Sequence, residues 1–149
     1  ARQLWVGETS STYGGGSGSA SRSFAAGFLW LDKLGLAASL GHAAVLRQAL
    51  VGNDYALLGE DDLPNPDFYV AVLWKRLMGR RVLRVLDGLL PNRTLRAYAF
   101  CARGRDGGVA LAVLNTRATR VAVRFPRLRG PLEAYVLTAA EPSARDVFL

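Results

Sequence analysis

The sequence contains one cysteine and one histidine among 149 residues, and this shortage excludes several kinds of site. A disulfide framework within the chain and a zinc site built from cysteine pairs are both ruled out. Cys101 is expected to be either a buried small hydrophobic residue or half of a disulfide whose partner lies beyond Leu149. His42 has no cysteine or second histidine nearby, so we expect a structural role for it. Since haem and nucleotide motifs are missing too, neither a metal nor a cofactor is expected.

Long apolar runs are missing as well. A membrane-spanning helix needs about 20 consecutive apolar residues. The longest apolar stretch, residues 24–40, is interrupted by Asp32, Lys33 and two glycines, so we expect a core helix there and no transmembrane segment. The chain begins at Ala1 without a basic and then apolar leader, which carries no information about its compartment.

The net charge of +7 is unevenly distributed along the chain. Residues 1–79 carry six basic and seven acidic side chains, whereas residues 80–149 carry thirteen basic and five acidic ones. Seventeen of the nineteen basic residues are arginine, an excess that a GC-rich coding bias would also produce. The alternative is a surface that attracts an anionic partner such as a sulfated glycan or nucleic acid. Charge alone does not decide between these explanations.

Two units of a strand followed by a helix are predicted in the first half. Residues 3–6 are typical of a short buried strand that stops at Gly7-Glu8, and residues 9–19 form a loop rich in glycine and serine. Apolar residues at spacings of four and three then predict a helix that Gly35 ends. They are Phe24, Phe28, Leu31 and Leu34.

The second unit follows the same order. Residues 43–46 form a short apolar run, and a loop over residues 52–66 leads to another helix. Asn65 is its expected N-cap and Pro66 its first residue, because proline lacks only a backbone N–H that is unpaired there anyway. We expect Gly79 to end this helix. Its buried side should contain Phe68, Tyr69, Val72, Leu73 and Leu77.

After Arg80 the pattern changes to short strands separated by turns. The predicted strands cover residues 82–86, 95–102, 109–114, 120–125 and 133–138. The fold class is therefore α/β. Residues 1–79 are typical of βα units from a parallel barrel or sheet, and residues 80–149 of part of an antiparallel β-sandwich.

Glu8 is the strongest candidate for a catalytic residue. It lies where an apolar strand gives way to a long loop, the position from which (β/α)8 enzymes supply catalytic side chains. It is the only acid in the first thirty-one residues, and Gly7 before it lets a substrate approach closely. The glycines at positions 14–16 offer backbone N–H groups to a polar ligand, and Tyr13 and Tyr55 both follow strands. An exposed loop glutamate without a role is the alternative interpretation.

Several blocks of sequence resemble the heparanase family of endo-β-glucuronidases, glycoside hydrolase family 79. Residues 5–16, WVGETSSTYGGG, closely resemble the nucleophile segment of that family, and residues 24–36 resemble the helix that follows it. Shorter matching blocks continue in the same order. They are Arg47-Gln48, Asn53-Asp54-Tyr55, Pro66-Asp67-Phe68-Tyr69 and residues 73–79. The resemblance is strong over residues 1–86 and thinner to about residue 140.

The resemblance implies a hydrolase of the lysosome and the extracellular matrix that cuts internal glucuronic acid linkages of heparan sulfate with retention of configuration. The implied fold is a (β/α)8 barrel, of which residues 1–79 are the C-terminal part, followed by a β-sandwich. Glu8 is implied as the nucleophile. The residues implied to contact the substrate are Gly14, Gly15 and Gly16, which meet the uronate carboxylate, together with Gln48 and Tyr55.

The same resemblance implies partners and modifications. Heparan sulfate or heparin, the remainder of the barrel and a small N-terminal processed subunit would bind this chain, and nucleic acid would not. Cys101 matches a sandwich cysteine that the family pairs with one near its C-terminus. Asn92 begins an Asn-Arg-Thr glycosylation sequon, which agrees with a secreted or lysosomal protein.

Retaining hydrolysis needs two carboxyl groups about 5–5.5 Å apart. One attacks the anomeric carbon as a carboxylate, while the other holds a proton for the leaving oxygen. The resemblance places the second group on an earlier strand, upstream of Ala1, so we expect the 149-residue chain alone to be inactive. The alternative from a different class is a noncatalytic basic protein that binds heparin or heparan sulfate through residues 80–149.

Overall fold

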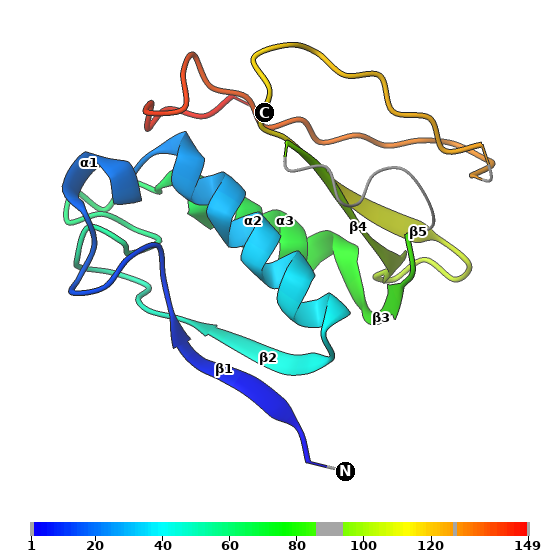
Figure 1. Cartoon of the computed structure of the whole chain (residues 1–149), viewed down its shortest axis with the longest axis horizontal. Coiled ribbons are helices and arrows are strands. Elements are labelled where there is room, and N and C mark those ends of the chain that lie inside the picture. Colours follow the sequence, from blue (N-terminus) through cyan, green and yellow to red (C-terminus); the bar gives the residue numbers. More distant parts are fainter. Residues whose placement is uncertain (1, 86–93, 127, 149) are drawn as a thin grey trace.

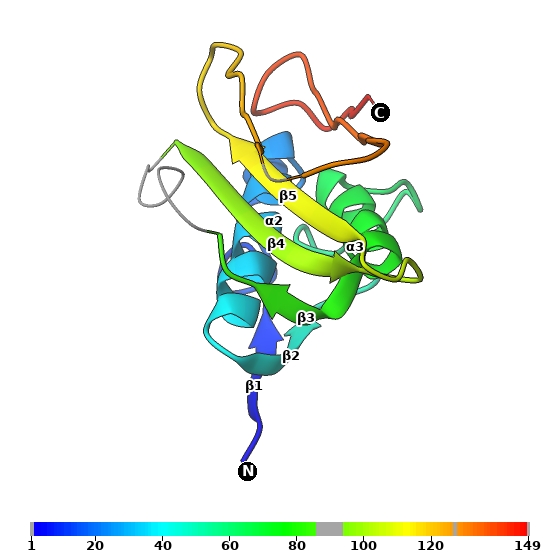
Figure 2. The ribbon, with the colours of Figure 1, turned by 90° about the vertical axis from the view of Figure 1, so that its right-hand side faces the viewer.

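The computed structural model describes residues 2–85, 94–126 and 128–148 of the chain. Within them, two sheets enclose a layer of two long helices (Figures 1 and 2), so the mixed α/β class is confirmed. None of the described helices is long and apolar enough to cross a membrane. In chain order the elements are β1 (Leu4–Thr9), α1 (Gly18–Ser21), α2 (Phe24–Ser39), β2 (His42–Arg47), α3 (Pro66–Leu77), β3 (Met78–Leu83), β4 (Leu95–Ala102) and β5 (Val109–Asn115).

The strands β1 and β2 form a parallel pair connected through α2. Their register pairs Leu4 with His42 at one end and Thr9 with Arg47 at the other. Because parallel strands run in the same direction, both carboxyl ends lie at one edge, where the loops that follow them meet. The predicted burial of the first strand is wrong, since Leu4 and Trp5 are 59% and 60% exposed. In the described chain α2 lies on one side of the pair, and nothing lies on the other (Figure 1).

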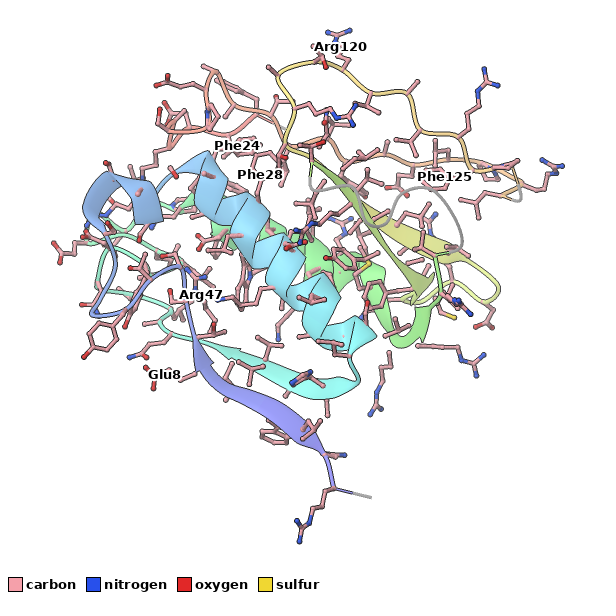
Figure 3. All side chains as sticks on the ribbon, in the orientation of Figure 1. Glu8, Phe24, Phe28, Arg47, Arg120 and Phe125 are labelled. Atoms are coloured by element: carbon pink, nitrogen blue, oxygen red, sulfur yellow. The ribbon has the colours of Figure 1, made fainter. Side chains whose placement is uncertain are left out.

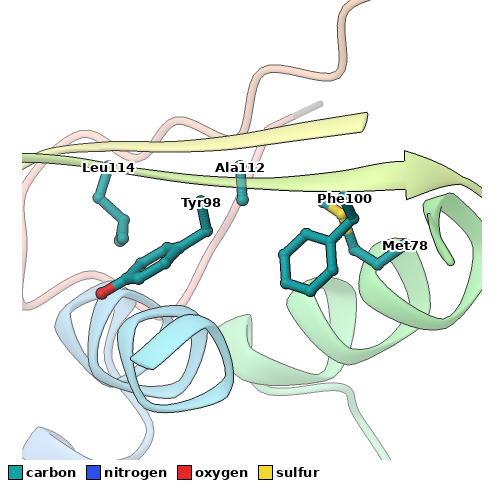
Figure 4. Close-up of a cluster of buried hydrophobic side chains, with 5 residues drawn as sticks. All are labelled: Met78, Tyr98, Phe100, Ala112 and Leu114. Atoms are coloured by element: carbon teal, nitrogen blue, oxygen red, sulfur yellow. The ribbon is translucent and has the colours of Figure 1, made fainter. Parts of the chain in front are cut away.

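The strands β3, β4 and β5 form an antiparallel sheet with β4 in the centre. Side chains of this sheet form a buried hydrophobic cluster that faces the helices (Figure 4). They are Met78, Tyr98, Phe100, Ala112 and Leu114. Phe28 of α2 and Trp74 of α3 pack against the cluster, and the rings of Trp74 and Phe100 meet edge to face with 4.9 Å between centroids. The antiparallel sheet therefore shares one core with the helices of the first half.

The helix α2 is longer than the apolar spacing predicts. It runs to Ser39, and Gly35, the expected stop, lies inside it. A Cβ atom at Gly35 would overlap the ring of Tyr98 in β4, so the close approach of the sheet requires glycine there. The left-handed residue that follows the helix is Gly41, at φ +81°. The prediction that Gly35 ends the helix is therefore wrong, because a glycine serves close packing as well as chain reversal.

The helix α3 begins at Pro66, as predicted. Its Val70 packs against Trp30, on a face of α2 other than the one that meets the sheet. The predicted buried side is wrong at Tyr69 and Val72, which are exposed, because α2 contacts α3 on the Val70 side. The chain then passes directly from α3 into β3, so the predicted stop at Gly79 falls inside a strand.

A segment near the C-terminus contacts the start of both long helices. The N–H of Phe24 donates to the carbonyl oxygen of Ala144 at 2.7 Å, which satisfies one of the unpaired N–H groups at the start of α2. Asn65, the predicted N-cap of α3, makes no side-chain capping bond. Its buried amide instead donates to the Ala56 carbonyl at 2.7 Å and accepts from Nε of Arg145 at 2.8 Å.

The second half of the chain has fewer strands than predicted. Two of the five, β4 and β5, agree with the prediction, and β3 begins earlier, at Met78. Residues 120–125 and 133–138 do not form the expected strands, and of the latter only Thr138 makes a single bridge, to Phe148. Their alternating sequences have no neighbouring strand in the described chain, so no ladder of hydrogen bonds forms.

Gly35→Ala should destabilise the chain by about 1–3 kcal/mol, because the new methyl group must displace the Tyr98 ring from a packed core. Gly27→Ala, in the same helix, is the matched control. Its added methyl would lie 3.6 Å from Cβ of Pro66, an ordinary contact, and alanine favours a helix by up to about 1 kcal/mol. Urea unfolding measures both. Equal stability of Gly35→Ala and the wild type would contradict the close approach of Tyr98.

Candidate active site

The carboxyl ends of β1 and β2 bring two of the predicted site residues together. Glu8 is the penultimate residue of β1, and its side chain is exposed (Figure 3). Within the described residues, its carboxylate has no hydrogen bond or ion pair. Gln48 follows β2, and its N–H donates to the carbonyl oxygen of Thr9 at 3.0 Å. The predicted nucleophile, Glu8, therefore directly precedes Thr9, the residue that bonds to Gln48. No described residue forms a hydrogen bond or ion pair with either oxygen of the Glu8 carboxylate.

The loop after β1 contains the three predicted glycines in left-handed conformations. Gly14, Gly15 and Gly16 have φ values of +71°, +97° and +122°, which side chains other than hydrogen rarely permit. Their N–H groups have no acceptor in the part of the chain that the structure describes. Consecutive unpaired N–H groups in such a loop can bind an anion.

A second loop, after β2, holds the glycine loop in place. The N–H of Tyr55 donates to the Gly15 carbonyl at 3.2 Å, and the Gly18 N–H donates to Oδ2 of Asp54 at 2.9 Å. Oδ1 of Asp54 accepts from Nη2 of Arg22 at 2.7 Å. We name residues 10–18 the glycine loop and residues 53–55 the clamp loop. Asp54 was not predicted as a site residue from the sequence, although it belongs to the Asn53-Asp54-Tyr55 block that resembles the heparanase family.

Tyr55 is only 7% exposed. Its carbonyl oxygen accepts from the side chains of Ser10, at 3.4 Å, and Arg47. The structure thus places Tyr55 beside the glycine loop, and its contact with substrate stays a prediction. Tyr13, by contrast, is 99% exposed.

Buried charges lie beneath the two loops, and sequence reasoning missed them. The Arg47 guanidinium donates to the Tyr55 carbonyl and to the fully buried carboxylate of Asp67, and it lies 4.8 Å from the ring centroid of Trp30. Burial raises the pKa of Asp67 to about 6, because loss of water around the carboxylate outweighs the attraction of Arg47. The available signals were the place of Arg47 directly after an apolar run and the membership of both residues in blocks that resemble the heparanase family.

Lys33 of α2 supports the end of β1 from the helix side. Its Nζ donates to Oγ1 of Thr9 and to the carbonyl of Ser10, both at 2.6 Å. Desolvation, and then the charge of Arg47, lower the pKa of Lys33. The two residues that follow Glu8 are therefore fixed by an ammonium group with no carboxylate partner in the described residues.

The remaining predicted residues lie away from this edge. Nδ1 of His42 is 3.2 Å from the Ala37 carbonyl oxygen, where it connects the end of α2 to β2. Cys101 is a half-buried free thiol on β4, and its disulfide stays a prediction. Asn92 lies outside the described residues. No group of three possible metal-binding side chains occurs among those described.

Comparisons with known proteins find similar chains among the heparanases and a glucuronidase. Heparanase of Mus musculus is 41% identical over 152 residues, which cover 95% of the chain and 28% of that protein. Heparanase of Bos taurus is 42% identical, with 99% of the chain and 28% of that protein covered. Baicalin-beta-D-glucuronidase of Scutellaria baicalensis is 38% identical, with 74% and 21% covered. No family model matches the chain.

The names of these relatives define a class, the glycoside hydrolases. Within it, the chain matches a C-terminal part of heparanases, which confirms the resemblance found in the sequence. The chain spans little more than a quarter of the length of the heparanases it matches.

Asp67→Asn should change how stability depends on pH. A carboxyl group whose pKa rises on folding contributes stability that is complete below about pH 4 and lost as pH rises through about 6. The free energy of unfolding of the wild type, relative to Asp67→Asn, should therefore increase on acidification from about pH 7.5 to 4, by on the order of 2 kcal/mol. Urea unfolding across this range measures the difference.

Asp61→Asn is the control with the opposite sign. The Asp61 carboxylate is exposed, and its hydrogen bonds from Arg145 hold its pKa well below the usual range. A carboxyl group whose pKa falls on folding contributes stability above about pH 4, and this contribution is lost on further acidification. The free energy of unfolding of the wild type, relative to Asp61→Asn, should thus stay level from about pH 7.5 to 5 and decrease at lower pH. Parallel trends for the two variants would contradict the desolvation of Asp67.

Proposed function

We propose that this chain supplies the nucleophile of a retaining endo-β-glucuronidase that hydrolyses internal glucuronic acid linkages of heparan sulfate. One observation carries the proposal. Glu8 is a free, exposed carboxylate at the carboxyl end of a parallel strand, next to the glycine loop. The similarity to heparanases and to a glucuronidase supports the substrate class.

Glu8 attacks the anomeric carbon of the glucuronic acid unit. Its carboxylate forms a covalent ester with the sugar, while a carboxylic acid from another part of the protein protonates the leaving oxygen. The second group then takes a proton from water, which cleaves the ester and restores Glu8 with the anomeric configuration retained. Because no described residue occupies the oxygens of Glu8, they are available for this attack.

The backbone of the glycine loop suits an acidic sugar. The unpaired N–H groups of positions 14–16 are proposed to bind the uronate carboxylate, with Gln48 and Tyr55 lining the subsite. Among the described residues, three cations and two carboxylates make the polar contacts on and beneath the two loops, and the free carboxylate of Glu8 beside them brings the charges into balance. They are Arg22, Lys33 and Arg47, against Asp54 and Asp67.

Further parts of the protein belong to this proposal. The exposed apolar side chains of β1 and β2, among them Leu4, Trp5 and Leu46, suit additional strands of a (β/α)8 barrel. The partners are then the remainder of the barrel and a small N-terminal subunit, and the β3–β5 sheet is part of a sandwich. A lysosomal and extracellular location, glycosylation of Asn92 and a disulfide at Cys101 complete it.

Glu8→Gln should lower the rate of heparan sulfate cleavage by the full-length protein by at least about 1,000-fold, because an amide cannot form the glycosyl ester. A mechanism-based glucuronide inactivator, followed by peptide mass spectrometry, should label Glu8. Glu60→Gln is the control, since Glu60 is an exposed loop residue. Label on another acid, or near-normal activity of Glu8→Gln, would refute the assignment.

A noncatalytic heparin-binding protein is the second candidate, and the arginines of β3 favour it. Arg80 and Arg81 on this strand, and Arg84 just after it, are exposed and lack a carboxylate partner in the described chain. By contrast, Arg105, which follows β4 in the sequence, forms an ion pair with Glu133. Heparin binding through these arginines should be largely nonspecific and should weaken steeply as the salt concentration rises.

The intact 149-residue chain should bind heparin without cleaving heparan sulfate. Replacing Arg80, Arg81 and Arg84 with serine should lower the salt concentration that elutes the chain from heparin more than replacing Arg2, Lys75 and Arg76. This control has the same loss of charge and lies outside residues 80–149. An equal reduction by both would favour coding bias as the origin of the arginines. Cleavage by the purified chain would refute the need for a second carboxyl group from elsewhere.

A further inference from the structure

The Asp54 carboxylate connects three segments of the candidate site. Its Oδ2 accepts from the Gly18 N–H at 2.9 Å, at the end of the glycine loop, and its Oδ1 accepts from Nη2 of Arg22 at 2.7 Å. Asp54 itself belongs to the clamp loop. Each oxygen therefore has its own donor. One short side chain holds together the glycine loop, the clamp loop and Arg22, which lies between α1 and α2.

The glycine loop depends on such contacts because its own sequence is permissive. Three consecutive glycines at positive φ have more conformational freedom than any other residues. Gly14 has no neighbour within 4 Å of where a side chain would begin, so packing does not restrain it. Around the glycines themselves, the other hydrogen bonds are from the Tyr55 N–H to the Gly15 carbonyl and from the Ser17 N–H to Oγ of Ser21 at 2.9 Å. Lys33 holds the start of the loop at the Ser10 carbonyl.

Asp54 also sets the position of Gly16 by direct contact. A Cβ atom added at Gly16 would lie 2.5 Å from Cβ of Asp54 and 2.8 Å from the backbone nitrogen of Tyr55. The two loops thus touch with no room for a side chain. A change in the conformation of Asp54 would therefore reorient the peptide groups of Gly15 and Gly16, whose N–H groups are unpaired within the described chain.

We propose that Asp54 is a positioning residue that fixes the glycine loop in the conformation that recognises a sugar carboxylate, and so determines selectivity for uronides over neutral glycosides. This inference rests on the proposed function. The role is positional, since a negative charge close to the glycine N–H groups would by itself disfavour an anionic sugar.

The test compares two substitutions in the full-length protein. Asp54→Ala removes both acceptors, whereas Asp54→Asn keeps the shape and one acceptor oxygen but removes the charge. The probes are an aryl β-glucuronide and the matching aryl β-glucoside, which lacks the carboxylate. Asp54→Ala should lower the ratio of kcat/KM for glucuronide over glucoside at least about tenfold, mainly through KM for the glucuronide. Asp54→Asn should restore most of that ratio, and Asp106→Ala, at an exposed turn aspartate, should leave it unchanged.

Hydrogen–deuterium exchange of residues 11–18 provides a readout that does not need activity. Asp54→Ala should speed exchange in this segment, and Asp54→Asn much less so. Unchanged exchange, or an unchanged selectivity ratio, would overturn the positioning role. A higher glucuronide selectivity in both variants would also overturn it, because that result would assign the effect to charge. A wild-type protein without glucuronidase activity would refute the proposed function, while the exchange result would still decide whether Asp54 holds the loop.

Discussion

The arrangement of the candidate site depends on the buried guanidinium of Arg47 at the end of β2. It joins that strand to the carbonyl of Tyr55 in the clamp loop, to the carboxylate of Asp67 at the start of α3 and to the face of Trp30 in α2. Planar, delocalised charge suits this site, since lysine could not make these contacts together. Because removal of one partner from a buried ion pair leaves an uncompensated charge, each of the four segments constrains the others.

The exposed and buried parts of the site have different tasks. Glu8 is exposed, and its carboxylate has no partner among the described residues. Lys33, which holds the next two residues, Thr9 and Ser10, and Arg47, which holds the Tyr55 carbonyl, lie beneath the loops. Between these layers, the three glycines at positions 14–16 contribute backbone N–H groups and no side chains. The rigid layer can therefore position a nucleophile and an anion site without occupying either, as a preorganised active site requires.

The sequence predicted the parallel unit, β4, β5 and the start of α3 correctly, because their apolar spacing and turn residues act locally. Prediction from the sequence failed where contacts between distant segments determine the structure. Gly35 was expected to end a helix, and only the approach of Tyr98 from β4 explains it. Glu8 could be placed at the edge of the parallel pair because it lies at the end of a predicted strand, and the resemblance to the heparanase family added Gln48. The contacts of Asp54 and Arg47 could not, since they join residues far apart along the chain through side-chain geometry that periodicity does not contain.

The stereochemistry of hydrolysis shows whether Glu8 acts as a nucleophile. If Glu8 forms a covalent intermediate, two successive displacements leave the configuration at the anomeric carbon unchanged. Proton NMR of a heparan sulfate oligosaccharide during cleavage by the full-length protein resolves the first-formed reducing end before it mutarotates. We expect the β-anomer of glucuronic acid to appear first and the α-anomer to follow. Initial appearance of the α-anomer would contradict it, because a single displacement by water inverts the centre and leaves Glu8 no role as a nucleophile.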